Sequence, residues 1–301
     1  MCFSSFKATG KTQAAKPFRF NLNPTTFTFL KLKIMVRTGY WLVAVAALAV
    51  VGCTPSKEKK AEVDALKINY SIRSVWPHDT EAFTQGLVIH KGQLYESTGQ
   101  KGTSWIGLVD VATGKLDKKV ILDSRYFGEG IDIINNKVYQ LTWQDHTGFV
   151  YNLRDFKKIK EWTYKSEGWG LTNDGTNIIM SDGTNQLHFL DTASLEIKKS
   201  ISVTDEQGPV KNLNELEYVD GYVYANVWQT NLIVKIDPAS GKVVGRLDLT
   251  QLYKDARNAN PQMDVLNGIA WHPETQSLLV TGKQWPHIYI LKIDAQSKPV
   301  K

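Results

Sequence analysis

Residues 129–144 read EGIDIINNKVYQLTWQ, two short β-rich runs on either side of a polar turn at Asn135 and Asn136. Four other stretches share this layout: QGLVIHKGQLYESTGQ (85–100), WGLTNDGTNIIMSDG (169–183), NELEYVDGYVYANVWQ (214–229) and NGIAWHPETQSLLVTGKQ (267–284). Their second residues follow one another at spacings of 44, 40, 45 and 53 residues. A repeat of this length, built from strands and turns, predicts an all-β fold made of similar units.

Each of these strand pairs is followed by a third apolar strand that ends at Asp or Asn, and four of the five then enter a turn and a fourth strand. Four antiparallel strands every 40 to 50 residues predict a five-bladed β-propeller. The fifth unit lacks its fourth strand, and LKINYSIRSV (66–75) can supply it, so that the last blade is closed by the N-terminal strand. A plain β-sandwich is the alternative.

Equivalent positions of a propeller converge on one mouth of its central channel. The first residues of the five segments form a predicted first ring of Gln85, Glu129, Trp169, Asn214 and Asn267. The ends of the second strands form a predicted second ring of Gly99, Trp143, Asp182, Trp228 and Lys283. A charged residue such as Glu129 at a buried strand entry is costly unless it is paired or used. Polar groups among aromatic residues therefore indicate a pocket.

The formal charge of +6 comes from the N-terminal segment 1–52, because this segment contains seven basic residues and no acidic residue. The remaining 29 basic and 30 acidic residues give no reason to expect nucleic acid as a partner. Residues 35–52 have the basic start and apolar run of a signal segment, and VVGC resembles the lipobox of bacterial lipoproteins, with Cys53 as the lipidated residue. A plain signal with a coincidental cysteine is the alternative.

We therefore expect four parts: an upstream extension at 1–34 that is spurious if Met35 is the true start, a signal at 35–52, a lipidated tether at 53–65 and a propeller at 66–301. The protein is expected to be exported and anchored in the membrane as a lipoprotein, in the periplasm or cell envelope of a bacterium. Cys2 is the other cysteine, so the body has no disulfide framework.

Seven motifs along the predicted propeller point to one family: VWPHDTEAFTQGL, YFGEGI, LTW, GWGL, LNELEY, DVLNGIAW and LLVTGKQWP. They resemble the plant-type, also bacterial, glutaminyl-peptide cyclotransferases, metal-independent glutaminyl cyclases with a five-bladed propeller. The resemblance runs from about residue 67 to 294. It implies conversion of an N-terminal glutamine of peptides or proteins to pyroglutamate with release of ammonia. It also implies that no metal or cofactor takes part, and we expect a monomer.

Such a reaction needs a carboxyl group that moves a proton, and Glu129 is the predicted shuttle. Trp143, Trp169 and Trp228 are expected to wall the site, exclude water and hold the peptide, with Phe83 as a further wall. Lys283, Asn214 and Gln85 are candidate donors to the amide oxygen, with their division of roles left open.

Each assignment has a structural alternative. Glu129 could accept backbone N–H bonds at a blade mouth, Trp143 and Trp228 could pack between blades, and Lys283 could be solvated at the rim. Asn267 and Asp182 are expected to be turn or channel-lining groups.

Two other functions compete with cyclisation. Glu129, Asn214, Asn267 and Asp182 carry oxygen ligands that a calcium-dependent, lactonase-like hydrolase could gather around a cation. A non-catalytic, peptide-binding propeller is the third possibility. The segment QLYKDARNANPQMD (251–264), which accounts for the longest spacing, is expected to be a loop that borders the second or third residue of the substrate.

Overall fold

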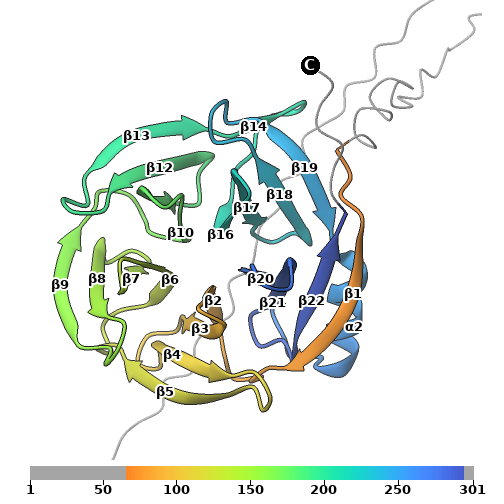
Figure 1. The fold of residues 1–301 in the computed structure, drawn as a ribbon, viewed down its shortest axis with the longest axis horizontal. Helices are drawn as coiled ribbons and strands as arrows, with labels where there is room; N and C mark the ends of the chain where they lie inside the picture. Colours follow the sequence, from red (N-terminus) through yellow and green to blue (C-terminus); the bar gives the residue numbers. More distant parts are fainter. Residues whose placement is uncertain (1–65, 295–301) are drawn as a thin grey trace, which may run out of the picture. The chain divides into compact units, whose positions relative to one another are not determined.

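The computed structural model describes residues 66–294, which form five four-stranded antiparallel sheets arranged around a central axis (Figure 1). The predicted extension, signal and tether lie outside the described residues. Within the described part, no helix is long and apolar enough to cross a membrane.

The strands have the following bounds. Blade 1 contains β2 (Thr84–His90), β3 (Gln93–Thr98), β4 (Trp105–Asp110) and β5 (Lys115–Ile121). Blade 2 contains β6 (Gly128–Ile134), β7 (Lys137–Thr142), β8 (Thr147–Asn152) and β9 (Lys158–Thr163). Blade 3 contains β10 (Leu171–Asn173), β11 (Asn177–Ser181), β12 (Gln186–Asp191) and β13 (Ile197–Ser202). Blade 4 contains β16 (Leu213–Val219), β17 (Tyr222–Val227), β18 (Leu232–Ile236) and β19 (Val243–Asp248). Blade 5 contains β20 (Leu266–His272), β21 (Ser277–Gly282), β22 (His287–Ile293) and β1 (Tyr70–Pro77), while β14 (Thr204–Asp205) and β15 (Gly208–Pro209) form a separate hairpin.

The ring is closed as predicted, because β1 pairs antiparallel with β22 from Tyr70 opposite Ile293 to Pro77 opposite His287. The strand begins four residues later than the start of the predicted stretch, at Tyr70. Residues 66–68 instead pair with the outer strand of blade 4, where Ile68 N donates to Arg246 O at 2.8 Å. The first segment of the fold thus joins blades 4 and 5, and the N-terminal strand leaves no unpaired edge on β22.

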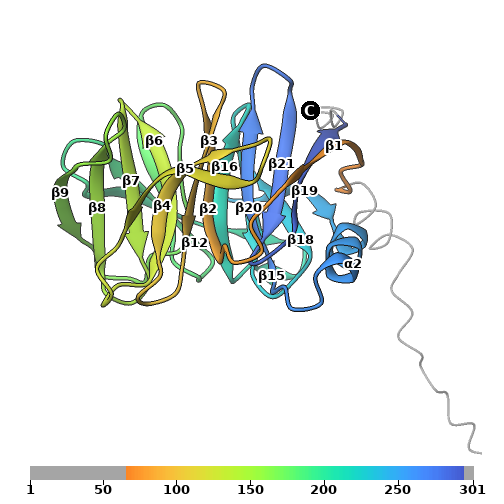
Figure 2. The same ribbon diagram turned by 90° about the horizontal axis from the view of Figure 1, so that it is seen from below.

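The apolar core is divided among the five blade interfaces. One cluster lies between each pair of neighbouring blades: for example, Ile106 and Val138 join blades 1 and 2, while Leu87 and Leu279 join blades 1 and 5. The inner strands of each sheet therefore need apolar residues on both faces, whereas the outer strands β1, β5, β9 and β13 are largely exposed. Figure 2 shows the blades side by side from the flank, with their strands running between the two ends of the channel.

Glycines after the first-ring residues let the inner strands approach one another. A Cβ on Gly130 would lie 2.7 Å from the backbone N of Leu171 in the next blade, and one on Gly170 would meet the carbonyl of Asn214. The fourth blade has Glu215 at this position. Its two carboxylate oxygens accept the backbone N–H groups of Leu87 (3.1 Å) and Ile269 (2.7 Å), and so connect blade 4 to blades 1 and 5.

The prediction of a loop at 251–264 is wrong for most of that segment, since α2 (Thr250–Ala259) occupies it. Leu252 and Ala256 lie one helical turn apart, are buried, and pack in the same cluster as Met263 and Trp285 of blade 5. Helices of this length gain most of their stability from tertiary packing, and that packing is absent from the local sequence pattern. In Figure 1, α2 lies outside blade 5, beside β1 and β22.

Candidate functional site

The first ring lies where the inner strands are interrupted by β-bulges. In four blades the register between the inner strand and its neighbour shifts at the predicted residue: Gln85, Glu129, Asn214 and Asn267. A bulge re-aims a side chain that regular pleating would direct elsewhere. Blade 3 differs, because Trp169 precedes the short β10 and its N–H donates to Ser181 O at 3.0 Å.

The second ring is held beside the first by one repeated backbone hydrogen bond. The second-ring N–H donates to the carbonyl of the residue two positions before the first-ring residue in the same blade. This bond joins Gly99 to Phe83 (2.8 Å), Trp143 to Phe127 (3.0 Å), Trp228 to Asn212 (2.9 Å) and Lys283 to Val265 (3.0 Å). The structure thus brings both rings to one end of the channel.

A chain of side-chain hydrogen bonds reaches Glu129 across three blades. Asn267 Nδ2 donates to Gln85 Oε1 at 3.0 Å, and Gln85 Nε2 donates to Glu129 Oε1 at 3.1 Å. All three side chains are buried, and Glu129 retains only 4% of its exposure. The arrangement fixes one carboxylate oxygen of Glu129 and leaves Oε2 without a hydrogen-bond partner in the part of the chain that the structure describes.

The environment of Glu129 favours its protonated form. Burial raises the pKa of Glu129 well above its usual range; Lys283 opposes this rise, and the negative charge of Glu167 adds to it. Burial also shifts the pKa of Lys283, which it lowers, although the negative charges of Glu129 and Asp264 act to raise it. The pKa of an acid is thus raised and the pKa of a base is lowered within one site, shifts that are typical of residues that transfer protons.

Two buried polar side chains of the two rings, those of Lys283 and Asn214, have no hydrogen-bond partner among residues 66–294. Lys283 is 5% exposed, and its Nζ lies 4.6 Å from the centre of the Phe83 ring without a hydrogen bond to any residue of 66–294. Asn214 is 3% exposed, and its buried Oδ1 is likewise unpaired among those residues. Buried polar groups are almost always paired, so these two are candidates to bind a ligand. The alternative of a solvated Lys283 at the rim is wrong.

Aromatic rings surround this polar floor. Phe83 meets Phe127 edge to face with ring centres 6.1 Å apart, and Phe127 meets Trp143 at 5.7 Å. Trp169 and Trp228 meet at 5.4 Å and 86°. These rings are partly exposed whereas the polar floor is buried, which is the arrangement of a pocket wall rather than of a blade core.

The sequence analysis missed Glu167, which joins the two halves of this wall. Its Oε2 accepts the indole N–H of Trp143 at 2.7 Å and that of Trp169 at 2.9 Å, and its Oε1 accepts Gln144 Nε2 at 2.9 Å. Glu167 stands two residues before Trp169, as Phe83 and Phe127 stand two residues before their own ring positions. Strand alternation could therefore have found it as part of a third ring.

Asp182 does not turn toward Glu129. Its Oδ2 lies 3.0 Å from His188 Nε2, and its Oδ1 accepts the backbone N–H of Thr184 at 3.0 Å. Of the four oxygen ligands considered for calcium, Asp182 thus has other partners for both of its carboxylate oxygens. Asn267 donates to Gln85 through Nδ2, and its buried Oδ1 has no hydrogen-bond partner among residues 66–294. Between residues 66 and 294, no group of three or more His, Cys, Asp or Glu side chains is arranged to hold a metal ion.

The segment 260–265 reaches the site although α2 does not. Asp264 N donates to Lys283 O at 2.9 Å, and Trp285 Nε1 donates to Asp264 O at 3.1 Å. Asn260 Nδ2 donates to Gln284 O at 2.8 Å. Most of 251–264 is therefore a packed helix rather than a loop, and the end of the segment supports the turn that carries Lys283. Its contact with the second or third residue of the substrate stays a prediction.

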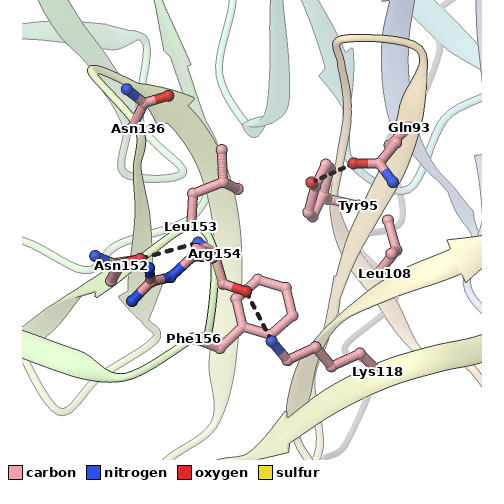
Figure 3. Close-up of a pocket in the computed structure, with 9 residues that line it drawn as sticks. All are labelled: Gln93, Tyr95, Leu108, Lys118, Asn136, Asn152, Leu153, Arg154 and Phe156. Atoms are coloured by element: carbon pink, nitrogen blue, oxygen red, sulfur yellow. Dashed lines mark hydrogen bonds between the residues drawn. The ribbon is translucent and has the colours of Figure 1, made fainter.

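An open groove of about 630 Å³ lies elsewhere, between blades 1 and 2 (Figure 3). It includes Gln93, Asn136 and Asn152, which belong to turns at the opposite end of the strands from Glu129. None of the predicted site residues lines it.

The fold and the site together define a class: a five-bladed β-propeller enzyme with a buried acid and a buried lysine inside an aromatic pocket. The chain belongs to the glutamine cyclotransferase family, whose sequence model matches residues 44–293. It is 40% identical over 225 residues to a glutaminyl-peptide cyclotransferase of Arabidopsis thaliana, covering 74% of this chain and 70% of the plant protein. The crystal structure of Myxococcus xanthus glutaminyl cyclase superposes with a TM-score of 0.71 and 32% identity, covering 76% of this chain and 98% of that one.

Proposed function

We propose that this protein converts the N-terminal glutamine of peptides or proteins to pyroglutamate. The observation that carries the proposal is the buried carboxyl of Glu129 at the same mouth of the channel as the side chains of Lys283 and Asn214, which have no hydrogen-bond partner among residues 66–294. Family membership supports the reaction class, an acyl transfer in which the acceptor is the substrate's own amine.

In this reaction the neutral α-amine attacks the side-chain amide carbon, and a new carbon–nitrogen bond forms. Glu129 takes a proton from the attacking nitrogen and delivers it to the departing amide nitrogen. The old carbon–nitrogen bond then breaks, ammonia leaves, and the lactam ring of pyroglutamate remains. One carboxyl can serve both steps, and burial, by raising its pKa, makes it a stronger base toward the attacking amine.

We also propose a division of the roles that the sequence left open, supported by the hydrogen bonds of the site. Gln85 already donates to Glu129, so it orients the carboxyl. Lys283 and Asn214 keep their amino and amide groups free, and we assign them to the amide oxygen, on which negative charge develops. Phe83, Trp143, Trp169 and Trp228 enclose the glutamine side chain and limit the access of water.

The test is mass spectrometry of a glutamine-initiated peptide incubated with the purified protein. Loss of one ammonia is expected, and the same peptide with an acetylated N-terminus should not react because it lacks the attacking amine. EDTA should leave the rate intact. Loss of activity with EDTA and rescue by calcium would favour the lactonase-like alternative, and binding without turnover would favour a peptide-binding propeller.

We also propose that the protein is exported, cleaved before Cys53 and anchored through a lipid on that residue, as a monomer. The basic and apolar run of 35–52 and the following VVGC support this proposal. The polar segment TPSKEKKAEVD after Cys53 has the composition of a flexible tether.

A further inference from the structure

We propose that Glu167 is a positioning residue for the cyclisation reaction: its carboxylate sets the orientation of Trp143 and Trp169, the adjoining walls of the pocket. The inference rests on the proposed function, because its kinetic test uses that reaction. Glu167 itself does not touch the reacting atoms. It acts mainly through the two rings, and its negative charge also adds to the rise in the pKa of Glu129.

The hydrogen bonds around Glu167 support this role. A tryptophan side chain has one polar hydrogen, and for both rings it is directed at the same oxygen, Oε2 of Glu167. Bonds to an ionised acceptor are about twice as strong as neutral ones. The carboxylate is available in that form, since the hydrogen bonds from Gln144, Trp169 and Trp143 outweigh burial and lower its pKa.

The two rings belong to different blades, which is why a shared acceptor matters. Trp143 follows β7 of blade 2 and is packed on Phe127, whereas Trp169 precedes β10 of blade 3 and is packed on Trp228. The Glu167 carboxylate joins these two aromatic pairs. Without it, each indole would keep one ring neighbour but lose the bond that fixes its rotation, and the wall would be free to open between blades 2 and 3.

A second consequence concerns the proton shuttle. The negative charge of Glu167 adds to the rise in the pKa of Glu129. Removing that charge should lower the pKa of Glu129. The acidic limb of the pH–rate profile would then move to lower pH, a change that a purely structural role would not produce.

The test compares Glu167→Gln with the parent protein. The control variant is Glu196→Gln, which also removes one carboxylate but at an exposed position. We expect kcat/KM of Glu167→Gln to fall roughly 10- to 100-fold, the cost of a small misplacement in a catalytic site. Thermal unfolding should change little because Glu167 is partly exposed. The Nε1–H resonances of Trp143 and Trp169, assigned with the Trp143→Phe and Trp169→Phe variants, should both move.

A double-mutant comparison then asks whether Glu167 works through the indoles. In a background carrying both Trp→Phe changes, neither ring can donate to the carboxylate, and Glu167→Gln should cost less than about 3-fold. The proposal is overturned if kcat/KM of Glu167→Gln lies within twofold of the parent, or if the change lowers kcat/KM equally with and without the two tryptophans. It is also overturned if the indole resonances do not move or if the variant does not fold. A parent without turnover would instead refute the proposed function, while the resonances would still test the hydrogen bonds.

Discussion

Replacing Glu129 with glutamine keeps the side-chain shape and removes the titratable proton. In the folded protein the carboxylate accepts a single hydrogen bond, from Gln85 Nε2, and a glutamine oxygen can accept the same bond. No backbone N–H of residues 66–294 donates to that carboxylate, so the alternative in which Glu129 serves as an acceptor for backbone groups has no support in the structure. The stability change should therefore stay within about 1 kcal/mol.

The effect on turnover should be far larger. Loss of a general acid–base group costs roughly 10²- to 10⁴-fold in rate, equivalent to about 2.7 to 5.5 kcal/mol of activation free energy. Because burial raises the pKa of Glu129, the parent's rate should rise with pH through an acidic limb that lies above the usual range of a glutamate. The Glu129→Gln variant should lose that limb.

The assay measures melting and ammonia release on the same sample at several pH values, with Glu196→Gln as the control. A folded Glu129→Gln protein that cyclises glutamine peptides at nearly the parental rate would refute the assignment. A variant that loses about 1 to 3 kcal/mol of stability would show that the carboxylate is needed for the fold.

Three further outcomes are expected. Burial raises the pKa of Asp132 to about 6, so its contribution to stability is greatest when it is protonated and falls as pH rises through that value. The parent and Asp132→Asn are compared by urea unfolding. The free energy of unfolding of the parent, relative to that of the variant, should fall by up to about 3 kcal/mol between pH 4 and pH 7. The Asp117→Asn variant, changed on an exposed strand, is the control. His78→Ala should cost about 3 to 5 kcal/mol because it leaves the buried Glu96 without its ion-pair partner at 3.1 Å, with the Thr84 hydroxyl still donating to the carboxylate. Burial lowers the pKa of His78, but the charge of Glu96 and its hydrogen bond raise it by more, so this cost should be larger at pH 6 than at pH 9. An equal cost at both pH values would contradict the pairing. Finally, Cys53→Ser should release the protein from the membrane fraction, and retention there would refute the lipid anchor.

Repetition made the fold readable from the sequence. Each blade encodes its own strands and turns, so five similar segments predict five blades, and the missing fourth strand of the last one predicts closure by the N-terminal strand. Repeat-equivalent positions must occupy equivalent places around the axis. For that reason Glu129, Asn214 and Lys283 could be assigned to one mouth before any contact was known.

Contacts between blades were not readable in the same way. The helix α2 depends on burying Leu252 and Ala256 against blade 5, and its local pattern resembles a polar loop. Glu167 looks like an ordinary surface carboxylate in the sequence, and only the meeting of blades 2 and 3 brings both indoles to it.

The sequence alone thus determined the number of blades, the closing strand and most of the residues at the channel mouth, because these follow from periodicity along one chain. The tertiary structure decided which of those residues pair and which stay free. The side chain of Gln85 is bonded to Glu129, while the side chains of Lys283 and Asn214 have no hydrogen-bond partner among the described residues. Hydrogen bonding and burial depend on distances between segments 40 to 180 residues apart, as between Asn267 and Gln85, and those distances exist only once the ring has closed.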